Sequence, residues 1–209
     1  MKNTIRPLLA AFACMAAAAT FHGCQENVDE SARYIFKHDL ILSYLEKHEV
    51  YSEYVALLKQ VPISAMSESS VAQLLSARGH YTCFAPTNEA IKVYLQDLVA
   101  QDIIERPSWD AFSDSMQLDS VRKVIVYNSV IDSGDEDFYE TSTFPVTNNA
   151  EFPISNMNGR KLTVNYVEGS TDSILIDGKN LIDFRNRDIP ALNGVIHQMR
   201  SVVAPSIVS

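Results

Sequence analysis

Two short stretches, far apart in the chain, constrain its fold more than any other feature. The first is residues 81–90 (YTCFAPTNEA) and the second is residues 193–205 (NGVIHQMRSVVAP). In the first, a run of apolar and small side chains predicts a buried strand. The strand should end at Pro86, because proline has no N–H for a hydrogen-bond ladder. Thr87 then suits a helix N-cap, since its hydroxyl can accept an N–H of the first turn.

The second stretch opens with Asn193-Gly194, a turn signal, and continues as a long strand that Pro205 ends. We expect Gly194 to take a positive φ, which glycine adopts without strain. His197 falls on the strand face that carries Val195 and Met199, an apolar surface. A histidine in that setting is more often a hydrogen-bonded core residue than a catalytic or metal-binding one, although the sequence leaves both open.

This ordered pair of stretches, about 110 residues apart, resembles the two signature motifs of the fasciclin domain, T-x-F-A-P-T-N-x-A-F and N-G-V-I-H-x-I-D-x-V-L-x-P. The resemblance covers about residues 37–205 and implies a single α+β domain, a small wedge-shaped β-sandwich with helices packed along one edge. It implies a structural role for the motif residues Thr87, Asn88, Asn193, Gly194 and His197.

Hydrophobic periodicity independently separates a helical first part from a strand-rich second part. Apolar spacing of three and four predicts helices over residues 31–49, 52–61, 69–77, 88–99 and 118–130. Alternating patterns predict strands over residues 141–146, 152–154, 161–167, 173–176, 181–185 and 195–203, with hairpin turns at Asn158-Gly159 and Asp177-Gly178. Helices first and strands later indicate an α+β fold and not alternating βαβ units.

The N-terminus resembles a lipoprotein export signal. Lys2 and Arg6 precede an apolar run of about a dozen residues, which is short for a membrane span. Gly23-Cys24 then resembles a bacterial lipobox, which implies that residues 1–23 are a lipoprotein signal peptide and that Cys24 carries palmitate-type acyl chains. The alternative is ordinary signal-peptidase cleavage near residues 17–19, with Cys24 unmodified.

Residues 24–36 are then the lipidated cysteine and a polar tether. Residues 25–30 (QENVDE) within it are acidic and too poor in apolar side chains to pack. This predicts a lipid-anchored protein of the cell envelope, in the outer membrane, with exposure at the cell surface as an open alternative. Cysteine usage agrees, because Cys14 would leave with the signal and only Cys83 would remain as a thiol. A single thiol in an apolar strand supplies no disulfide framework and acts as a small hydrophobic side chain.

Charge and motif content argue against several function classes. The formal net charge is −9, and no dense Lys/Arg stripe is present, so nucleic acid is not an expected partner. No phosphate-binding glycine loop, nucleophile elbow or zinc motif occurs, so we expect no cofactor, no metal and no catalytic residues. The acidic residues within 132–140 lack the register of a calcium loop, which favours a solvated loop over an ion site.

Two dipeptides are candidate binding residues by the resemblance. Tyr127-Asn128 occupies a position where family members commonly carry Tyr-His, in a segment linked to adhesion in animal relatives. Asp188-Ile189 matches an Asp-Ile pair implicated in integrin binding in some animal relatives. Each has a structural alternative, in which Asn128 closes a helix by a hydrogen bond, Asp188 caps a turn and Ile189 fills the core.

These observations favour a membrane-anchored extracytoplasmic binding or adhesion module that recognises a protein or glycan surface without catalysis. The alternative is a ligand-binding accessory lipoprotein of an outer-membrane nutrient uptake system. In that case a small or apolar molecule would lie between helices and sheet.

Overall fold

A computed structural model describes residues 38–170 and 173–205. Cys24 and the tether of residues 24–36 lie outside this part of the chain. The helices are α2 (Ile41–Lys47), α3 (Ser52–Gln60), α4 (Val71–Leu75), α5 (Asn88–Ala100) and α6 (Ser115–Ser129). The strands are β1 (Tyr81–Pro86), β2 (Val130–Asp132), β3 (Ala150–Glu151), β4 (Thr163–Tyr166), β5 (Ile174–Ile176), β6 (Asn180–Leu181), β7 (Ile189–Ala191) and β8 (Gly194–Met199). Among the described residues, no helix combines the length and apolarity that crossing a bilayer requires.

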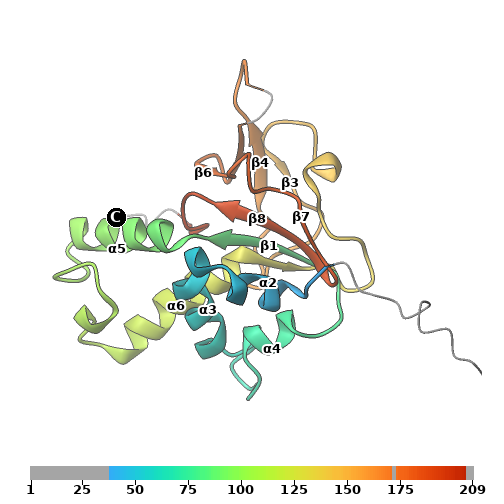
Figure 1. The fold of residues 1–209 in the computed structure, drawn as a ribbon. Helices are drawn as coiled ribbons and strands as arrows, with labels where there is room; N and C mark the ends of the chain where they lie inside the picture. Colours follow the sequence, from blue (N-terminus) through green and yellow to red (C-terminus); the bar gives the residue numbers. More distant parts are fainter. Residues whose placement is uncertain (1–37, 171–172, 206–209) are drawn as a thin grey trace, which may run out of the picture. The chain divides into compact units, whose positions relative to one another are not determined.

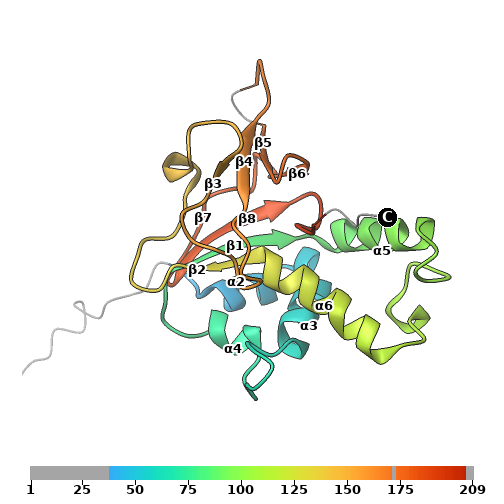
Figure 2. The ribbon, with the colours of Figure 1, turned by 180° about the vertical axis from the view of Figure 1, so that it is seen from behind.

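The first sheet brings the two motif stretches together. Its strand order is β2-β1-β8-β7, and β1 runs parallel to β8 in register from Tyr81 opposite Gly194 to Pro86 opposite Met199. Parallel strands are normally covered on both faces. Helices α2, α3, α4 and α6 lie on one side of this sheet and the second sheet lies on the other, as Figures 1 and 2 show.

The second sheet is antiparallel, with strand order β3-β4-β5-β6. Two isolated bridges connect segments adjoining this sheet to strands of the first sheet. They pair Asn156, in the β3–β4 loop, with Ile131, and Ile182, directly after β6, with Met199. The two sheets remain open at their edges, as in a sandwich. The expected α+β fold with a β-sandwich and packed helices is therefore confirmed.

Two apolar clusters fill the spaces between the layers, and successive side chains of β1 point alternately into one and the other. Cys83 and Ala85 face the cluster between sheet and helices, while Phe84 faces the cluster between the two sheets. The helix-side cluster also contains Ile41, Leu45, Tyr54, Leu58, Ile91, Ile125 and Ile196. The cluster between the sheets also contains Ile131, Phe144, Phe152, Val164, Ile176 and Met199.

The strand expected over residues 141–146 is wrong. A 3-10 turn covers Thr141–Thr143, and Phe144 after it is buried between the sheets. Threonine and aromatic residues favour strands, but here the Thr141 backbone N–H is taken by the Asp188 carboxylate at 2.7 Å. A contact from 47 residues away therefore overrides local strand propensity.

Several expected boundaries also shift. A helix was expected over residues 31–49, but within the described residues α2 begins at Ile41, with Leu40 as its N-cap residue. The next helix, α3, begins at Ser52 as expected, directly after a 3-10 turn over Glu49–Tyr51. The strand expected at residues 152–154 lies at Ala150–Glu151 instead.

Candidate functional site

Asn193 connects three segments from a buried position. Its Oδ1 accepts a hydrogen bond from the Ile41 N–H at 2.9 Å. Its Nδ2 donates to the carbonyl oxygens of Leu75 at 2.9 Å and Ala77 at 2.8 Å. The start of α2, the end of α4 and the start of β8 are thus held by one amide, which has little capacity left for a ligand.

Thr87 and Asn88 position α5. The Thr87 hydroxyl accepts the Ala90 N–H at 3.1 Å, which is an N-cap. Asn88 accepts the Glu53 N–H at 3.0 Å and donates to the Glu49 carbonyl at 2.9 Å and the Ser52 hydroxyl at 3.0 Å. The first turn of α5 is therefore fastened to the start of α3.

His197 is fully buried and both of its ring nitrogens are engaged. Nε2 lies 2.9 Å from the Tyr139 carbonyl oxygen, and Nδ1 accepts the Asp188 N–H at 3.3 Å. This pairing assigns the neutral tautomer with the proton on Nε2. The rings of Phe84 and Phe144 enclose it, with centroids 5.4 Å and 5.3 Å away. Burial lowers the pKa of His197 below its usual value, so the ring is neutral at neutral pH. The same burial keeps the ring out of reach of a substrate.

Cys83 is enclosed as well. Its Sγ lies 3.6 Å from the Tyr54 hydroxyl, which is itself 2.6 Å from the Ser129 hydroxyl. Burial raises the pKa of Cys83 to about 12, so the thiol stays protonated at neutral pH. A protonated, enclosed thiol is a poor nucleophile and a poor metal ligand.

Asp188 and Ile189 are both engaged by the protein. Asp188 has a φ of +54°, and its carboxylate accepts hydrogen bonds from the backbone N–H and the hydroxyl of Thr141. Ile189 is half-buried in β7 and packs against the helix-side cluster. In this arrangement the aspartate fastens a loop, and the isoleucine contributes to the core.

Tyr127 and Asn128 contact different parts of the protein. The Tyr127 hydroxyl donates to the Pro62 carbonyl at 2.6 Å. Asn128 is fully buried, and its Nδ2 donates to the Val124 carbonyl at 2.8 Å. Its Oδ1 accepts from Asn156 Nδ2 at 3.2 Å and Arg160 Nη2 at 3.3 Å. Asn128 therefore connects α6 to the loop between β3 and β4.

The two candidate pairs do not form one site. Val130, Cys83, Ile196 and Ile189 lie in one row across the first sheet, on its four successive strands. Three strand spacings separate the ends of that row, which is about 14 Å. Asn128 precedes one end and Asp188 precedes the other, so they lie at opposite edges.

The acidic loop shows no ion-binding arrangement in the part of the chain that the structure describes. Asp132 Oδ1 accepts the Gly134 N–H at 3.0 Å, which is a local turn contact. No group of three or more His, Cys, Asp or Glu side chains among the described residues is placed to hold a metal ion.

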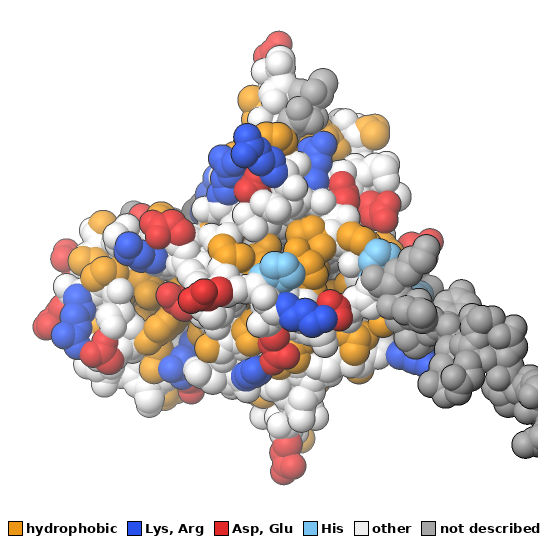
Figure 3. Space-filling model, in the orientation of Figure 1, with side chains coloured by type: hydrophobic (Ala, Val, Ile, Leu, Met, Phe, Trp, Pro, Cys, Tyr) orange, Lys and Arg blue, Asp and Glu red, His pale blue; other side chains and the backbone are white. Residues whose placement is uncertain are grey.

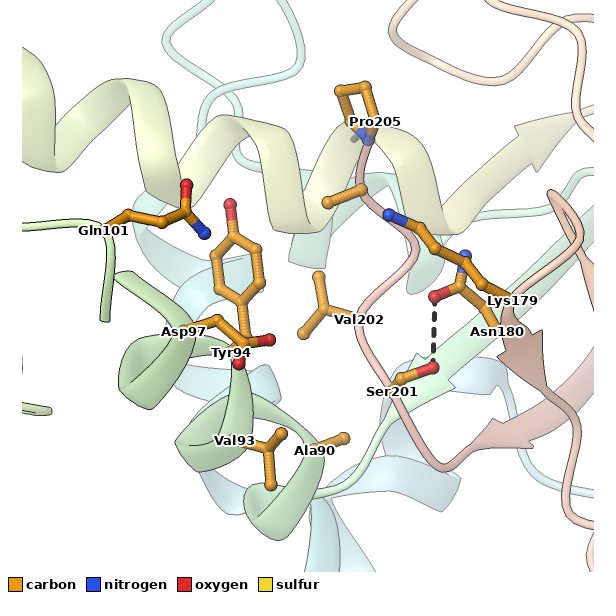
Figure 4. Close-up of a pocket in the computed structure, with 11 residues that line it drawn as sticks. Ala90, Val93, Tyr94, Asp97, Gln101, Lys179, Asn180, Ser201, Val202 and Pro205 are labelled. Carbon is orange, nitrogen blue, oxygen red and sulfur yellow. Dashed lines mark hydrogen bonds between the residues drawn. The ribbon is translucent and has the colours of Figure 1, made fainter. Parts of the chain in front are cut away.

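A pocket that the motifs did not indicate lies on the outer face of α5. Its volume is about 210 Å³, and Figure 4 shows side chains from α5 on one wall and from residues 179–180 and 201–205 on the other. We call it the α5 pocket. The α5 wall carries Tyr94, Asp97 and Gln101, spaced by three and four residues and therefore on one helix face. This spacing was readable from the sequence, but it does not say what lies opposite.

The opposite wall of the pocket carries both apolar and polar side chains and is held in place by hydrogen bonds. Val202 faces Tyr94 across the pocket in Figure 4, and Lys179 lies on the same side as Val202. The Ser201 hydroxyl donates to Asn180 Oδ1 at 3.0 Å, and Asn180 Nδ2 donates to the Ile176 carbonyl at 3.0 Å. These bonds hold the C-terminal segment against the β5–β6 hairpin.

The polar groups on the α5 wall are unengaged. Within residues 38–170 and 173–205, the Tyr94 hydroxyl, the Asp97 carboxylate and the Gln101 side-chain amide make no hydrogen bond. Burial, and then the nearby Asp97 carboxylate, raise the pKa of Tyr94 above its usual value. The Tyr94 hydroxyl is therefore protonated at neutral pH and can donate a hydrogen bond. Beside it, the Asp97 carboxylate can accept hydrogen bonds, and the Gln101 amide can both donate and accept them.

A second surface feature is charged and aromatic. Phe184 is 47% exposed and carries the Arg185 guanidinium over its ring, 5.4 Å from the centroid. Arg200 Nη2 lies 3.4 Å from Asp183 Oδ1 beside it. Figure 3 shows Lys and Arg side chains gathered over the β6 part of this face, with acidic and basic groups interspersed elsewhere.

Comparison with known proteins identifies the fold. The fasciclin domain family model matches residues 51–205. Among solved structures, the chain is similar to a FAS1 domain pair from the insect cell adhesion molecule fasciclin I, with a TM-score of 0.54 and 14% identity. The match covers 80% of this chain and 51% of that one, so this chain spans about half the length of the structure it matches. No curated protein matches the chain.

Proposed function

This chain belongs to the fasciclin domain family, and from that premise we propose that it is a non-catalytic binding module of the cell envelope. Fasciclin domains are adhesion-type modules, and the solved relative is described as a cell adhesion molecule. In our proposal a lipid on Cys24 holds the protein at a membrane, and the folded domain recognises a protein or glycan surface outside the cytoplasm.

The main support for this proposal is the contrast between enclosed reactive side chains and accessible polar ones. The side chains most often used for chemistry, His197 and Cys83, are fully enclosed and engaged. The unengaged polar side chains Tyr94, Asp97 and Gln101 instead line an open pocket. Binding requires accessible donors and acceptors on a rigid support, whereas catalysis also requires a reactive group that reaches the ligand.

The anchor in this proposal leaves the domain free to reach a partner. The tether of residues 25–36 has twelve residues, which span at most about 40 Å when extended. A lipid at Cys24 would then hold the domain within that distance of the membrane.

The test uses the full chain, purified in detergent with its native lipid. It is applied to arrays of immobilised cell-envelope polysaccharides and envelope proteins, and the bound material is then recovered and its mass measured. We expect saturable binding to at least one class and an unchanged ligand mass. The absence of binding on both arrays, or shortening or modification of the bound material, would contradict the proposal.

The α5 pocket favours a second candidate, an accessory lipoprotein of a nutrient uptake system. A pocket of about 210 Å³ suits capture of one small molecule better than contact with a broad flat surface. Cross-linking in intact cells separates the two candidates, because an accessory protein should be captured with an outer-membrane transporter. An adhesion module should instead be captured with a surface polymer or a structural protein.

A further inference from the structure

We propose that the α5 pocket binds a single pyranose ring, either as a free sugar or as the terminal unit of a glycan. This inference rests on the proposed binding function and assigns the ligand class of its pocket. Its evidence is the size of the pocket, the kinds of side chain that line it and their unengaged state.

The size of the pocket limits the ligand to one ring. Its volume of about 210 Å³ corresponds to about seven water molecules at liquid density. Sites for drug-sized ligands begin at about 300 Å³. One six-membered ring with its hydroxyl groups fits this space, and a second ring would have to extend into solvent.

The lining matches the two kinds of surface that a pyranose presents. A pyranose has a face of C–H groups and a rim of hydroxyls, each both a donor and an acceptor. Tyr94 and Val202 stand on opposite sides of the pocket in Figure 4 and can receive the C–H face. The negative face of an aromatic ring favours the weakly positive hydrogens of such groups.

Asp97 and Gln101 supply hydrogen-bond partners for the rim. A carboxylate accepts from two hydroxyls, and hydrogen bonds to an ionised acceptor are stronger than neutral ones. The Gln101 amide donates and accepts, so it can pair with a hydroxyl in either role. Asp97 lies on the same face of α5 as Tyr94, and Gln101 is the C-cap residue directly after this helix. The helix is fastened at its start by Thr87 and Asn88.

The unengaged state of the α5 wall strengthens the assignment. No protein hydrogen bond of Tyr94, Asp97 or Gln101 within the described residues must break before a ligand enters. A sugar would exchange these groups' water contacts for hydroxyl contacts of the same kind. An apolar ligand would instead displace water from the half-buried Tyr94 hydroxyl without replacing its hydrogen bond, which is costly.

Charge narrows the range of possible ligands further. The exposed Asp97 carboxylate disfavours an anionic ligand, because like charges repel. The main competing occupant is an α-amino acid, whose ammonium group could pair with Asp97 while its carboxylate approached Lys179 on the other wall. The experiment therefore contains both kinds of probe.

The test is saturation-transfer difference NMR on the full chain in detergent. The probes are the methyl pyranosides of glucose, galactose, mannose and N-acetylglucosamine, and a linear oligosaccharide of each sugar. Alanine and glutamate are the competing probes. We expect transfer to the ring C–H protons of at least one pyranoside. Tyr94→Ala and Asp97→Asn should each weaken its affinity about tenfold or more, because each removes a main contact.

Two matched controls keep structural effects apart from ligand contacts. Asp119→Asn removes an exposed carboxylate from α6, far along the chain from the pocket, and should leave affinity unchanged. Tyr94→Phe keeps the ring and removes the hydroxyl, so it should weaken binding less than Tyr94→Ala. A thermal melt checks that each variant is folded. A variant that fails to fold is replaced by Gln101→Ala, at the residue directly after the end of α5.

The outcomes distinguish a free sugar from a glycan end, and they distinguish the pocket assignment from the proposed binding function. Transfer confined to the terminal ring of an oligosaccharide assigns a glycan end, and transfer only to monosaccharides assigns a free sugar. Absent transfer, unchanged affinity in Tyr94→Ala and Asp97→Asn, or binding of the amino acids alone would overturn the pyranose assignment. If array binding survives in Tyr94→Ala, the binding function stands and only the pocket assignment fails.

Discussion

Tyr81 and Gly194 are direct partners in the parallel pair β1–β8, and their backbones approach so closely that no side chain fits at position 194. A Cβ on Gly194 would lie 2.8 Å from the Tyr81 carbonyl carbon and closer still to its oxygen. The φ of Gly194 is +149°, which side chains rarely allow. The positive φ expected from Asn193-Gly194 is present, but the main reason for glycine is this strand contact.

Gly194→Ala should therefore destabilise the protein by about 3–5 kcal/mol, because it combines backbone strain with a clash against a strand. The control is Gly159→Ala, at a glycine with φ of +74° and open space around its Cα, which should cost about 1 kcal/mol. Urea melts of both variants measure the difference. Equal costs at the two positions would contradict the close contact.

Asn193→Ala should lower the free energy of unfolding by about 2–4 kcal/mol, because it leaves the Ile41 N–H and two carbonyl oxygens without partners. Asn186→Ala, at an exposed asparagine with one weak side-chain contact, should cost less than about 1 kcal/mol. Denaturant melts provide the measurement. A melt of Asn193→Ala that matches Asn186→Ala would show that the buried amide does not hold these segments together.

The two motif residues at the start of α5 should differ in importance. Thr87→Ala removes one N-cap bond and should cost about 1 kcal/mol. Asn88→Ala removes three bonds to the segment before and within α3 and should cost about 1–3 kcal/mol. Side-by-side melts test the order, and a larger loss for Thr87→Ala would refute the role assigned to Asn88.

The stability of the protein should depend on His197 at mildly acid pH. Burial lowers the pKa of His197 in the folded protein, so the stability it contributes is complete above its unfolded pKa of about 6.5. That stability is lost as the pH falls from there through the folded pKa, by up to about 1.4 kcal/mol per pH unit. His197→Gln should therefore be less stable at pH 7 but lose less stability between pH 7 and pH 5.

The control for this pH series is His48→Gln, at an exposed histidine that follows α2 as its C-cap residue. Melts at pH 7, 6 and 5 are compared for the three proteins. Parallel loss of stability in the wild type and His197→Gln would show that the buried ring does not cause the pH dependence.

Lipidation at Cys24 remains a prediction from the sequence. Cys24→Ser should move the protein from the membrane fraction to the soluble fraction and abolish labelling with a palmitate analogue. Cys83→Ser is the matched control, since it changes an enclosed thiol and should leave both readouts as in the wild type. Full membrane partition with retained labelling in Cys24→Ser would reject the lipobox interpretation.

Part of the candidate site was visible in the sequence, and part was not. The α5 helix was predicted with its cap and its buried positions, because a capping threonine and apolar spacing act within one or two turns. The short strands Val130–Asp132 and Ile189–Ala191 were missed, because three residues are too few to show a period. The partners of Asn128 in the loop before β4 were equally invisible, since nothing local pairs them.

Local sequence patterns were enough to identify the family, the helical first part followed by a strand-rich second part, and the start of α5 at its Thr87 cap. Those features depend on signals that act over a few neighbouring residues, such as proline, glycine, N-caps and hydrophobic spacing. Three contacts could be seen only in the folded chain: Thr141 bonds the Asp188 carboxylate, two aromatic rings enclose His197, and Val202 faces Tyr94. These contacts join residues about 50 to 110 positions apart, and burial in a shared core selects them where no local pattern can.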